Sequence, residues 1–222
     1  MLGRDAVGML TAEPTGGVIW NASRGALTLR VTVRGRTAHV GLHHQGINAF
    51  ERMLKVGERL LSFKREVEGH RTGYHVNPSD AAASIVMLGG RVEGGTNFNM
   101  VPESCAFTVE RRFNPEEELA VEKAKLFEVF EVLRGEGLDL EVEVLQEGEA
   151  TGIPESVPLA KDLSDVVGAV TGRQPAFEMC PGLLETRWYT RQGIPALAYG
   201  PGSLEVAHGP DESDAIQRIH EC

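Results

Sequence analysis

The chain has 222 residues, of which 41% are hydrophobic and 24% charged, and this length suits one large domain or two modest ones. Its 22 Lys and Arg against 32 Asp and Glu give a formal net charge of −10, which argues against nucleic acid and anionic membranes as partners. No stretch is long and apolar enough to predict a membrane span. The few cysteines (Cys105, Cys180 and Cys222) lack metal-site spacing and predict reduced thiols in a cytoplasmic protein.

A short buried strand is the first predicted element, at residues 5–10, and it ends at a loop that contains Glu13, Pro14 and two glycines. A carboxylate just past a strand suits a loop that presents a ligand group. Most loop carboxylates, however, only face water. Both interpretations of Glu13 remain open on the sequence alone.

The middle of the chain, residues 24–148, predicts a complete small domain. Residues 27–34 alternate apolar and polar side chains, which is typical of a half-buried strand. A helix follows at residues 48–63, with Asn48 as its N-cap. Apolar residues and one glycine recur every three or four positions along one face of this helix: Ile47, Phe50, Leu54, Gly57 and Leu61.

The same domain predicts further strands at residues 84–88, 105–112 and 138–145 and a second helix at residues 115–133. Asn114 is the expected N-cap of that helix, and Pro115 suits its first position. The order strand–helix–strand–strand–helix–strand is typical of a ferredoxin-like arrangement, an α/β fold with both helices on one face of a sheet. The uncovered face and edge of such a sheet predict a homodimer.

The sequence changes character from Glu149, where a link rich in Gly, Pro and Thr begins. The predicted elements beyond it are helices at residues 159–170 and 184–192 and strands at residues 176–179 and 196–199. These strands are too few for a complete sheet, and the chain closes in what resembles the start of another helix. We therefore expect residues 1–23 and 149–222 to form one interrupted α/β domain, into which residues 24–148 are inserted.

The loop after the strand at residues 27–34 carries His39, His43 and His44. Loops held between a rigid strand and a helix are the usual setting of functional side chains. We expect His39 to reach out of its own domain into an active site. No role is predicted for His43 and His44, which suit a solvated loop.

Other candidates carry weaker signals. His208 lies in a Gly-rich loop at residues 199–212, and imidazole is a common metal ligand, although a lone loop histidine is more often solvated. Asn99 and Arg112 flank one predicted strand and could bind a carboxylate, or be a turn Asn and a surface Arg. Arg187 is either a carboxylate clamp or a solvated helix residue.

Several short segments occur together in a specific order: AEPT at 12–15, RGRTAH at 34–39, GINA at 46–49, GGTNFNMVP at 94–102, ERR at 110–112, ETR at 185–187 and the loop at 200–212. In this order and spacing the chain resembles the two-zinc amidohydrolase and peptidase family. That family includes acetylornithine deacetylase, succinyl-diaminopimelate desuccinylase, aminoacylase and the glutamate carboxypeptidases.

The resemblance implies a role for each candidate. Glu13 would be a ligand of one zinc and His208 a ligand of the other, with Co or Mn as possible substitutes. His39 would cross a dimer interface and stabilise the oxyanion in the partner's site. Asn99, Arg112 and Arg187 would contact the carboxylate of an N-acyl amino acid or a small peptide.

The resemblance also implies groups that this chain does not carry. They are a zinc-binding His with its Asp neighbour, an Asp that bridges the metals, and a Glu-Glu pair that includes the general base. We therefore expect a piece of such an enzyme, with an intact lid and dimerisation domain, that is inactive by itself. The alternative is a non-catalytic ferredoxin-like module that dimerises or binds a small amino-acid-like ligand.

Overall fold

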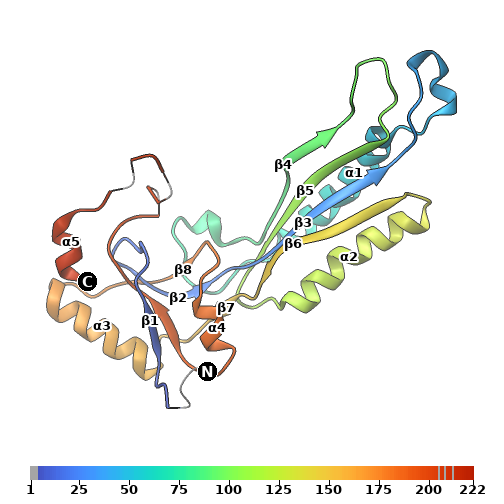
Figure 1. Cartoon of the computed structure of the whole chain (residues 1–222). Helices are drawn as coiled ribbons and strands as arrows, with labels where there is room; N and C mark the ends of the chain where they lie inside the picture. The colour runs from blue at the N-terminus through green and yellow to red at the C-terminus, as the bar shows by residue number, and fades with distance from the viewer. Residues whose placement is uncertain (1–4, 205, 208, 212) are drawn as a thin grey trace. The chain divides into compact units, whose positions relative to one another are not determined.

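The structure is a computed structural model, and it describes residues 5–222 except 205, 208 and 212 (Figure 1). The chain forms two compact units. The terminal unit comprises Met1–Gly25, Thr72–Ala82 and Glu149–Cys222, and the central unit comprises Ala26–Arg71 and Ala83–Gly148. No helix in the described part of the chain is long and apolar enough to cross a membrane.

The central unit is built on a four-stranded sheet with the strand order β4-β5-β3-β6. The strands are β3 (Gly25–Arg34), β4 (Ile85–Gly94), β5 (Ser104–Phe113) and β6 (Leu140–Gly148). β3 pairs antiparallel with β6, and β4 pairs antiparallel with β5. The predicted alternation in β3 is confirmed, because Leu27, Leu29, Val31 and Val33 are fully buried.

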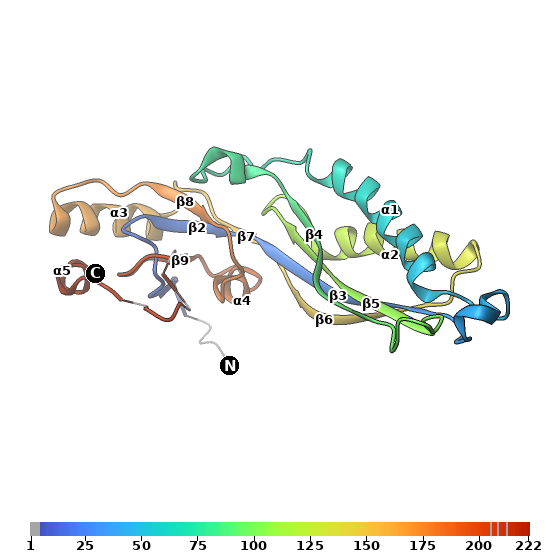
Figure 2. The same ribbon diagram turned by 90° about the horizontal axis from the view of Figure 1, so that it is seen from above.

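Two helices, α1 (Ala49–Val67) and α2 (Leu119–Gly135), lie on the same face of this sheet (Figure 2). The core between them and the sheet includes Val31 of β3, Leu60 of α1 and Phe130 of α2, all fully buried. Asn48 caps α1 as predicted, because its Oδ1 accepts hydrogen bonds from the backbone N–H groups of Phe50 and Glu51.

The apolar face predicted for α1 is mostly exposed. Phe50 is 52% exposed, Leu54 57% and Leu61 47%. The residues that pack against the sheet come from the neighbouring stripe of the helix: Ala49, Met53, Val56, Leu60 and Val67. Helix α1 therefore has two neighbouring apolar stripes, and only one of them is covered within the central unit.

The predicted start of α2 at residue 115 is wrong, since the helix begins at Leu119 with Glu118 as its N-cap. The preceding residues form a turn in which Glu117 N–H donates to Asn114 O at 3.0 Å. The carboxylate of Glu117 in turn accepts from Asn114 N–H at 2.7 Å and from Arg111 Nη2 at 2.7 Å. Glu117 thus serves a buried ion cluster instead of the first helical turn.

The terminal unit contains a mixed sheet with the strand order β1-β9-β2-β7, and β8 also pairs with β2. The strands are β1 (Met9–Thr11), β2 (Ile19–Ser23), β7 (Thr151–Gly152), β8 (Phe177–Cys180) and β9 (Ala196–Ala198). Strands β1 and β9 run parallel, as do β2 and β8. The fully buried strand β2 was not predicted.

Three helices accompany this sheet: α3 (Pro158–Thr171), α4 (Thr186–Thr190) and α5 (Ile216–Glu221). Ile19 and Leu197 pack with α3 through Ala160. Their strand neighbours Trp20 and Ala198 pack with Leu184, which precedes α4. The helix predicted at residues 184–192 is shorter in the structure, where it is α4.

The segment Thr72–Ala82 belongs to the terminal unit, although the predicted boundaries placed it in the middle domain. It contains the short 3₁₀ helix η2 (Ser79–Ala82). Val76 and Ala82 are buried against Ala22 and Met179, and Met179 N–H donates to His75 O at 2.7 Å. This apolar contact explains why the segment folds with the terminal unit.

Candidate functional site

The loop that carries Glu13 follows β1 and lies against the start of the loop that contains His208. Thr15 Oγ1 donates to Gly200 O at 3.2 Å, and Gly16 N–H donates to Gly202 O at 2.8 Å. A Cβ at Gly200 would stand 2.7 Å from the carbonyl oxygen of Glu13, so only glycine permits this approach. His208 itself lies outside the described residues.

A second carboxylate, Glu185, lies beside Glu13. Partial burial raises the pKa of Glu13, and the charge of Glu185 and a hydrogen bond with it raise that pKa further. Glu185 immediately precedes α4. Two carboxylates this close repel one another unless they share a proton or a cation, and carboxylate oxygens are ligands of divalent metals. The pair therefore suits part of a metal site.

The described residues do not complete such a site. They contain no group of three or more His, Cys, Asp or Glu side chains that could hold a metal ion. A zinc site needs about four ligands, of which Glu13 and Glu185 could supply two at most. No role was predicted for Glu185, and its place in the segment ETR, near Arg187, was the one signal in the sequence.

Arg187 lies in α4 and is held by its neighbours. Its guanidinium carbon is 4.5 Å from the centroid of the Trp188 ring, and its Nη1 donates to Leu184 O at 2.5 Å. Burial lowers the pKa of Arg187, and the negative charge of Glu185 opposes that change. The side chain is therefore oriented within the terminal unit and is not a freely solvated helix residue.

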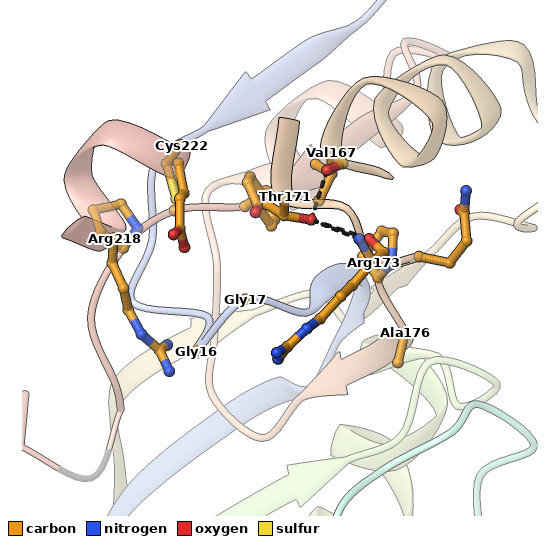
Figure 3. Close-up of a pocket in the computed structure, with 14 residues that line it drawn as sticks. Gly16, Gly17, Val167, Thr171, Arg173, Ala176, Arg218 and Cys222 are labelled. Carbon is orange, nitrogen blue, oxygen red and sulfur yellow. Dashed lines mark hydrogen bonds between the residues drawn. The ribbon is translucent and has the colours of Figure 1, made fainter. Parts of the chain in front are cut away.

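The terminal unit also has a cavity of about 250 Å³, lined by Gly16, Gly17, Arg173 and Arg218 among others (Figure 3). In Figure 3 the side chains of Arg173 and Arg218 both extend toward Gly16 and Gly17. None of the predicted site residues that the structure describes lines this cavity. It is therefore not the site that the sequence predicts.

In the central unit, His39 and Asn99 lie together at one end of the sheet, here called the tip. Val40 N–H donates to Asn99 O at 2.8 Å, and His39 pairs with Met100 in an isolated β-bridge. His39 is exposed and precedes the 3₁₀ helix η1 (Val40–Gln45). The structure thus brings two predicted site residues from distant parts of the sequence to one place.

Arg112 lies at the opposite end of β5 from this tip. Its Nε is 2.5 Å from Glu110 Oε1, an ion pair without hydrogen-bond geometry. Eight residue steps along β5, from Ser104 to Arg112, span about 26 Å. Within one central unit, Arg112 therefore cannot share a small-molecule site with His39 and Asn99.

The chain thus combines a mixed α/β unit that carries the Glu13–Glu185 pair with a unit of four strands and two helices. Residues 21–137, just over half of the chain, match the family model of the M20 peptidase dimerisation domain. The chain therefore belongs to the M20 family of peptidases and amidohydrolases.

Two curated relatives are desuccinylases. The chain is 29% identical over 213 residues to a putative succinyl-diaminopimelate desuccinylase of Mycobacterium tuberculosis, covering 95% of this chain and 54% of the relative. It is 27% identical over 211 residues to the succinyl-diaminopimelate desuccinylase of Corynebacterium glutamicum, covering 95% and 53%. The chain thus spans about half the length of these relatives.

Solved structures show the same fold at lower identity. The aminopeptidase PepT of Bacillus cereus aligns with a TM-score of 0.74 and 21% identity, over 97% of this chain and 55% of that one. Human carnosine dipeptidase 1 aligns with a TM-score of 0.68 and 10% identity, over 96% and 56%.

Proposed function

We propose that this chain is part of a two-zinc hydrolase that cleaves the amide bond of an N-acyl amino acid or a small peptide. The observation that carries the proposal is the close pair of the half-buried Glu13 and the exposed Glu185, with Glu13 packed beside Gly200 at the start of the His208 loop. The desuccinylase relatives favour an N-acylated amino acid. A cytoplasmic location is part of the same proposal.

The central unit would be the lid and dimerisation domain of this enzyme. Its order of strands and helices, its sheet order β4-β5-β3-β6 and its two helices on one face support a ferredoxin-like domain. The terminal unit is assembled from segments on both sides of it in sequence, which supports the insertion of one domain into the other.

The chain would form a homodimer through α1 and β4. Strands β4 and β6 are the edges of the sheet, but they differ in charge. β6 carries Glu141, Glu143 and Glu147, and charges of this kind discourage edge pairing. The first six residues of β4 carry no charge, and the exposed apolar stripe of Phe50, Leu54 and Leu61 lies on α1, which packs near β4.

Such a dimer would resolve the separation of the predicted site residues. His39 and Asn99 lie at the tip, and β5 spans about 26 Å from Ser104, at its tip end, to Arg112. They can act on the same substrate only if the tip of one copy reaches the site of another. We therefore propose that His39 and Asn99 serve the partner's site, whereas Glu13, Arg112 and Arg187 serve their own.

In this site Glu13 and His208 would each bind one of the two metals, and Glu185 would support Glu13. When bound, two zinc ions activate water and polarise the amide carbonyl. His39 would donate a hydrogen bond to the oxygen on which negative charge develops. Asn99, Arg112 and Arg187 would hold the substrate carboxylate, with the guanidinium groups providing paired donors.

The test compares this polypeptide with the same polypeptide preceded by a region that carries the His, Asp and Glu-Glu groups implied by the resemblance, here called the extended chain. We expect only the extended chain to bind about two zinc ions and to hydrolyse N-acyl amino acids. Activity of the short polypeptide would contradict the ligand scheme. Absence of metal from both would favour the non-catalytic module.

The dimer interface has its own test, Leu54→Glu on the exposed stripe of α1. We expect this charge to convert the dimer to monomer in light scattering, because it would be buried without a partner. The matched control is Val132→Glu on α2, where Val132 is 45% exposed and Leu54 57%. Equal effects of both changes, or of neither, would contradict the proposed interface.

A further inference from the structure

The imidazole of His39 has a backbone donor directed at one of its two nitrogens. Gly41 N–H donates to His39 Nδ1 at 3.1 Å. His39 occupies the N-cap position of η1 with extended backbone angles, φ −65° and ψ 144°, so its side chain turns back over the first turn. The donor belongs to the next residue but one, and the contact is fixed by local backbone geometry.

This contact determines which nitrogen carries the proton. A neutral imidazole has one N–H group and one nitrogen with a free lone pair. Gly41 N–H requires the lone pair at Nδ1, because a hydrogen on Nδ1 would be repelled by the amide hydrogen of Gly41. The proton of neutral His39 must then lie on Nε2, the nitrogen directed away from the backbone.

The residue type at position 41 bears on the position of the ring. A Cβ there would stand 3.8 Å from His39 Cε1, an ordinary contact, but 3.3 Å from Nδ1, a tight contact that the ring would relieve by moving a few tenths of an ångström. The φ of Gly41 lies outside the left-handed region, so the backbone does not require glycine at this position. The space beside the ring is what glycine provides.

We propose that Gly41 is a positioning residue whose N–H holds His39 in the Nε2–H form, as a ready hydrogen-bond donor, and whose missing side chain leaves room for the ring in this position. The inference rests on the proposed function for the use of that donor. A donor fixed before the substrate arrives needs no reorganisation when charge develops on the substrate oxygen. Gly41 itself touches no substrate in this account.

The first test needs no substrate and uses this chain with ¹⁵N-labelled histidine and glycine. We expect His39 Nδ1 to resonate as an unprotonated nitrogen and Nε2 as a protonated one. A scalar coupling across the hydrogen bond should link Gly41 N to His39 Nδ1. An Nδ1–H tautomer, or rapid averaging of both tautomers, would overturn the inference whatever the activity of the enzyme.

The second test measures turnover of the extended chain with Gly41→Ala, which crowds the ring, and Gly41→Pro, which removes the donor. We expect kcat of Gly41→Pro to fall about tenfold with little change in KM, in keeping with the loss of one hydrogen bond, and kcat of Gly41→Ala to fall less. Gly41→Pro should also lose the Nε2–H signature, whereas Gly41→Ala, which keeps its N–H, should retain it. Gly135→Ala is the control, since a Cβ at Gly135 meets nothing within 4 Å.

The outcomes separate this inference from the proposed function. An intact signature in Gly41→Pro would overturn the role of Gly41, even if His39→Ala abolishes turnover. Conversely, if wild type shows the coupling but His39→Ala retains full turnover, the geometry stands and the proposed use of His39 fails.

Discussion

The two ends of the central unit differ in how their polar groups are held. At the tip, His39 is exposed, Phe98 is 97% exposed, and the loops are joined by backbone hydrogen bonds such as Val101 N–H to Ala38 O at 2.8 Å. At the other end, here called the base, Arg111 is fully buried and binds Glu117 and Glu122. The tip is thus free to meet a partner or a substrate, whereas the base secures the fold.

The base cluster joins four segments of the central unit. Arg111 Nη2 donates to Glu122 at 2.6 Å and to Glu117 at 2.7 Å. Glu117 also accepts from Ser84 Oγ and lies 3.0 Å from His70 Nδ1. The cluster therefore connects the segment after α1, the residue before β4 and the end of β5 with α2 and the turn before it.

The largest expected effect on stability is that of Arg111→Ala. It removes the buried cation shared by Glu117 and Glu122 and leaves Glu122 only its ion pair with the exposed Lys125, which should lower the free energy of unfolding by about 3–5 kcal/mol. Urea denaturation measures this loss. Arg59→Ala, which breaks the exposed pair with Glu136, should cost below about 1 kcal/mol.

A compensating variant sharpens the same point. Arg111→Met combined with Glu117→Gln and Glu122→Leu removes the buried charges together and should recover much of the lost stability. Equal losses in the compensated and the single variant would show that packing, not charge, dominates at the base.

The pH dependence of stability should come in part from Glu117. Burial by itself would raise its pKa, but hydrogen bonds from Ser84, Asn114 and His70, with the charge of Arg111, lower it below 4.5. The folded chain therefore takes up this proton less readily than the unfolded chain. The stabilisation is complete above the unfolded pKa of about 4.5 and is lost as the pH falls through the folded pKa.

Unfolding free energies of wild type and Glu117→Gln should accordingly converge as the pH falls below 4.5. Glu141→Gln, in an exposed pair with Arg34, is the control and should show little convergence. A gap between wild type and Glu117→Gln that stays constant with pH would contradict this assignment.

The smallest effect is expected where α1 begins, next to the tip. Asn48→Ala removes the cap on the N–H groups of Phe50 and Glu51 and should cost about 1 kcal/mol. Ser62→Ala, in the exposed part of the same helix, should change stability by about 0.5 kcal/mol or less. Thermal unfolding of both variants checks this difference, and equal shifts would argue against a specific cap.

Local signals in the sequence predicted local structure well. The Asn48 cap and the alternation in β3 depend on neighbouring residues, and both are confirmed. The start of α2 was misplaced because Glu117 is recruited by Arg111, a tertiary contact that no local pattern contains. The face of α1 that packs on the sheet could not be predicted either, since two adjacent stripes of the helix are apolar.

The candidate site was predictable only as separate segments. Their order in the sequence indicated the family, and the family model supports it. Neither the contact of Glu13 with Glu185 nor the hydrogen bond from Gly41 to His39 could be read from spacing. The sequence indicated Arg112 as a candidate substrate-binding residue, whereas the arginine that is fully buried is its neighbour Arg111.

The most direct test of the account asks whether His39 serves the site of the partner. Extended chains that carry either Glu13→Gln or His39→Ala are each expected to be inactive. When the two variants are mixed, some dimers contain one copy of each. In such a dimer one site combines the intact Glu13 of the His39→Ala copy with the intact His39 of the Glu13→Gln copy. If the site is shared, a random mixture should recover about one quarter of wild-type activity. No recovery, with mixed dimers verified by mass, would show that His39 does not act in the partner's site.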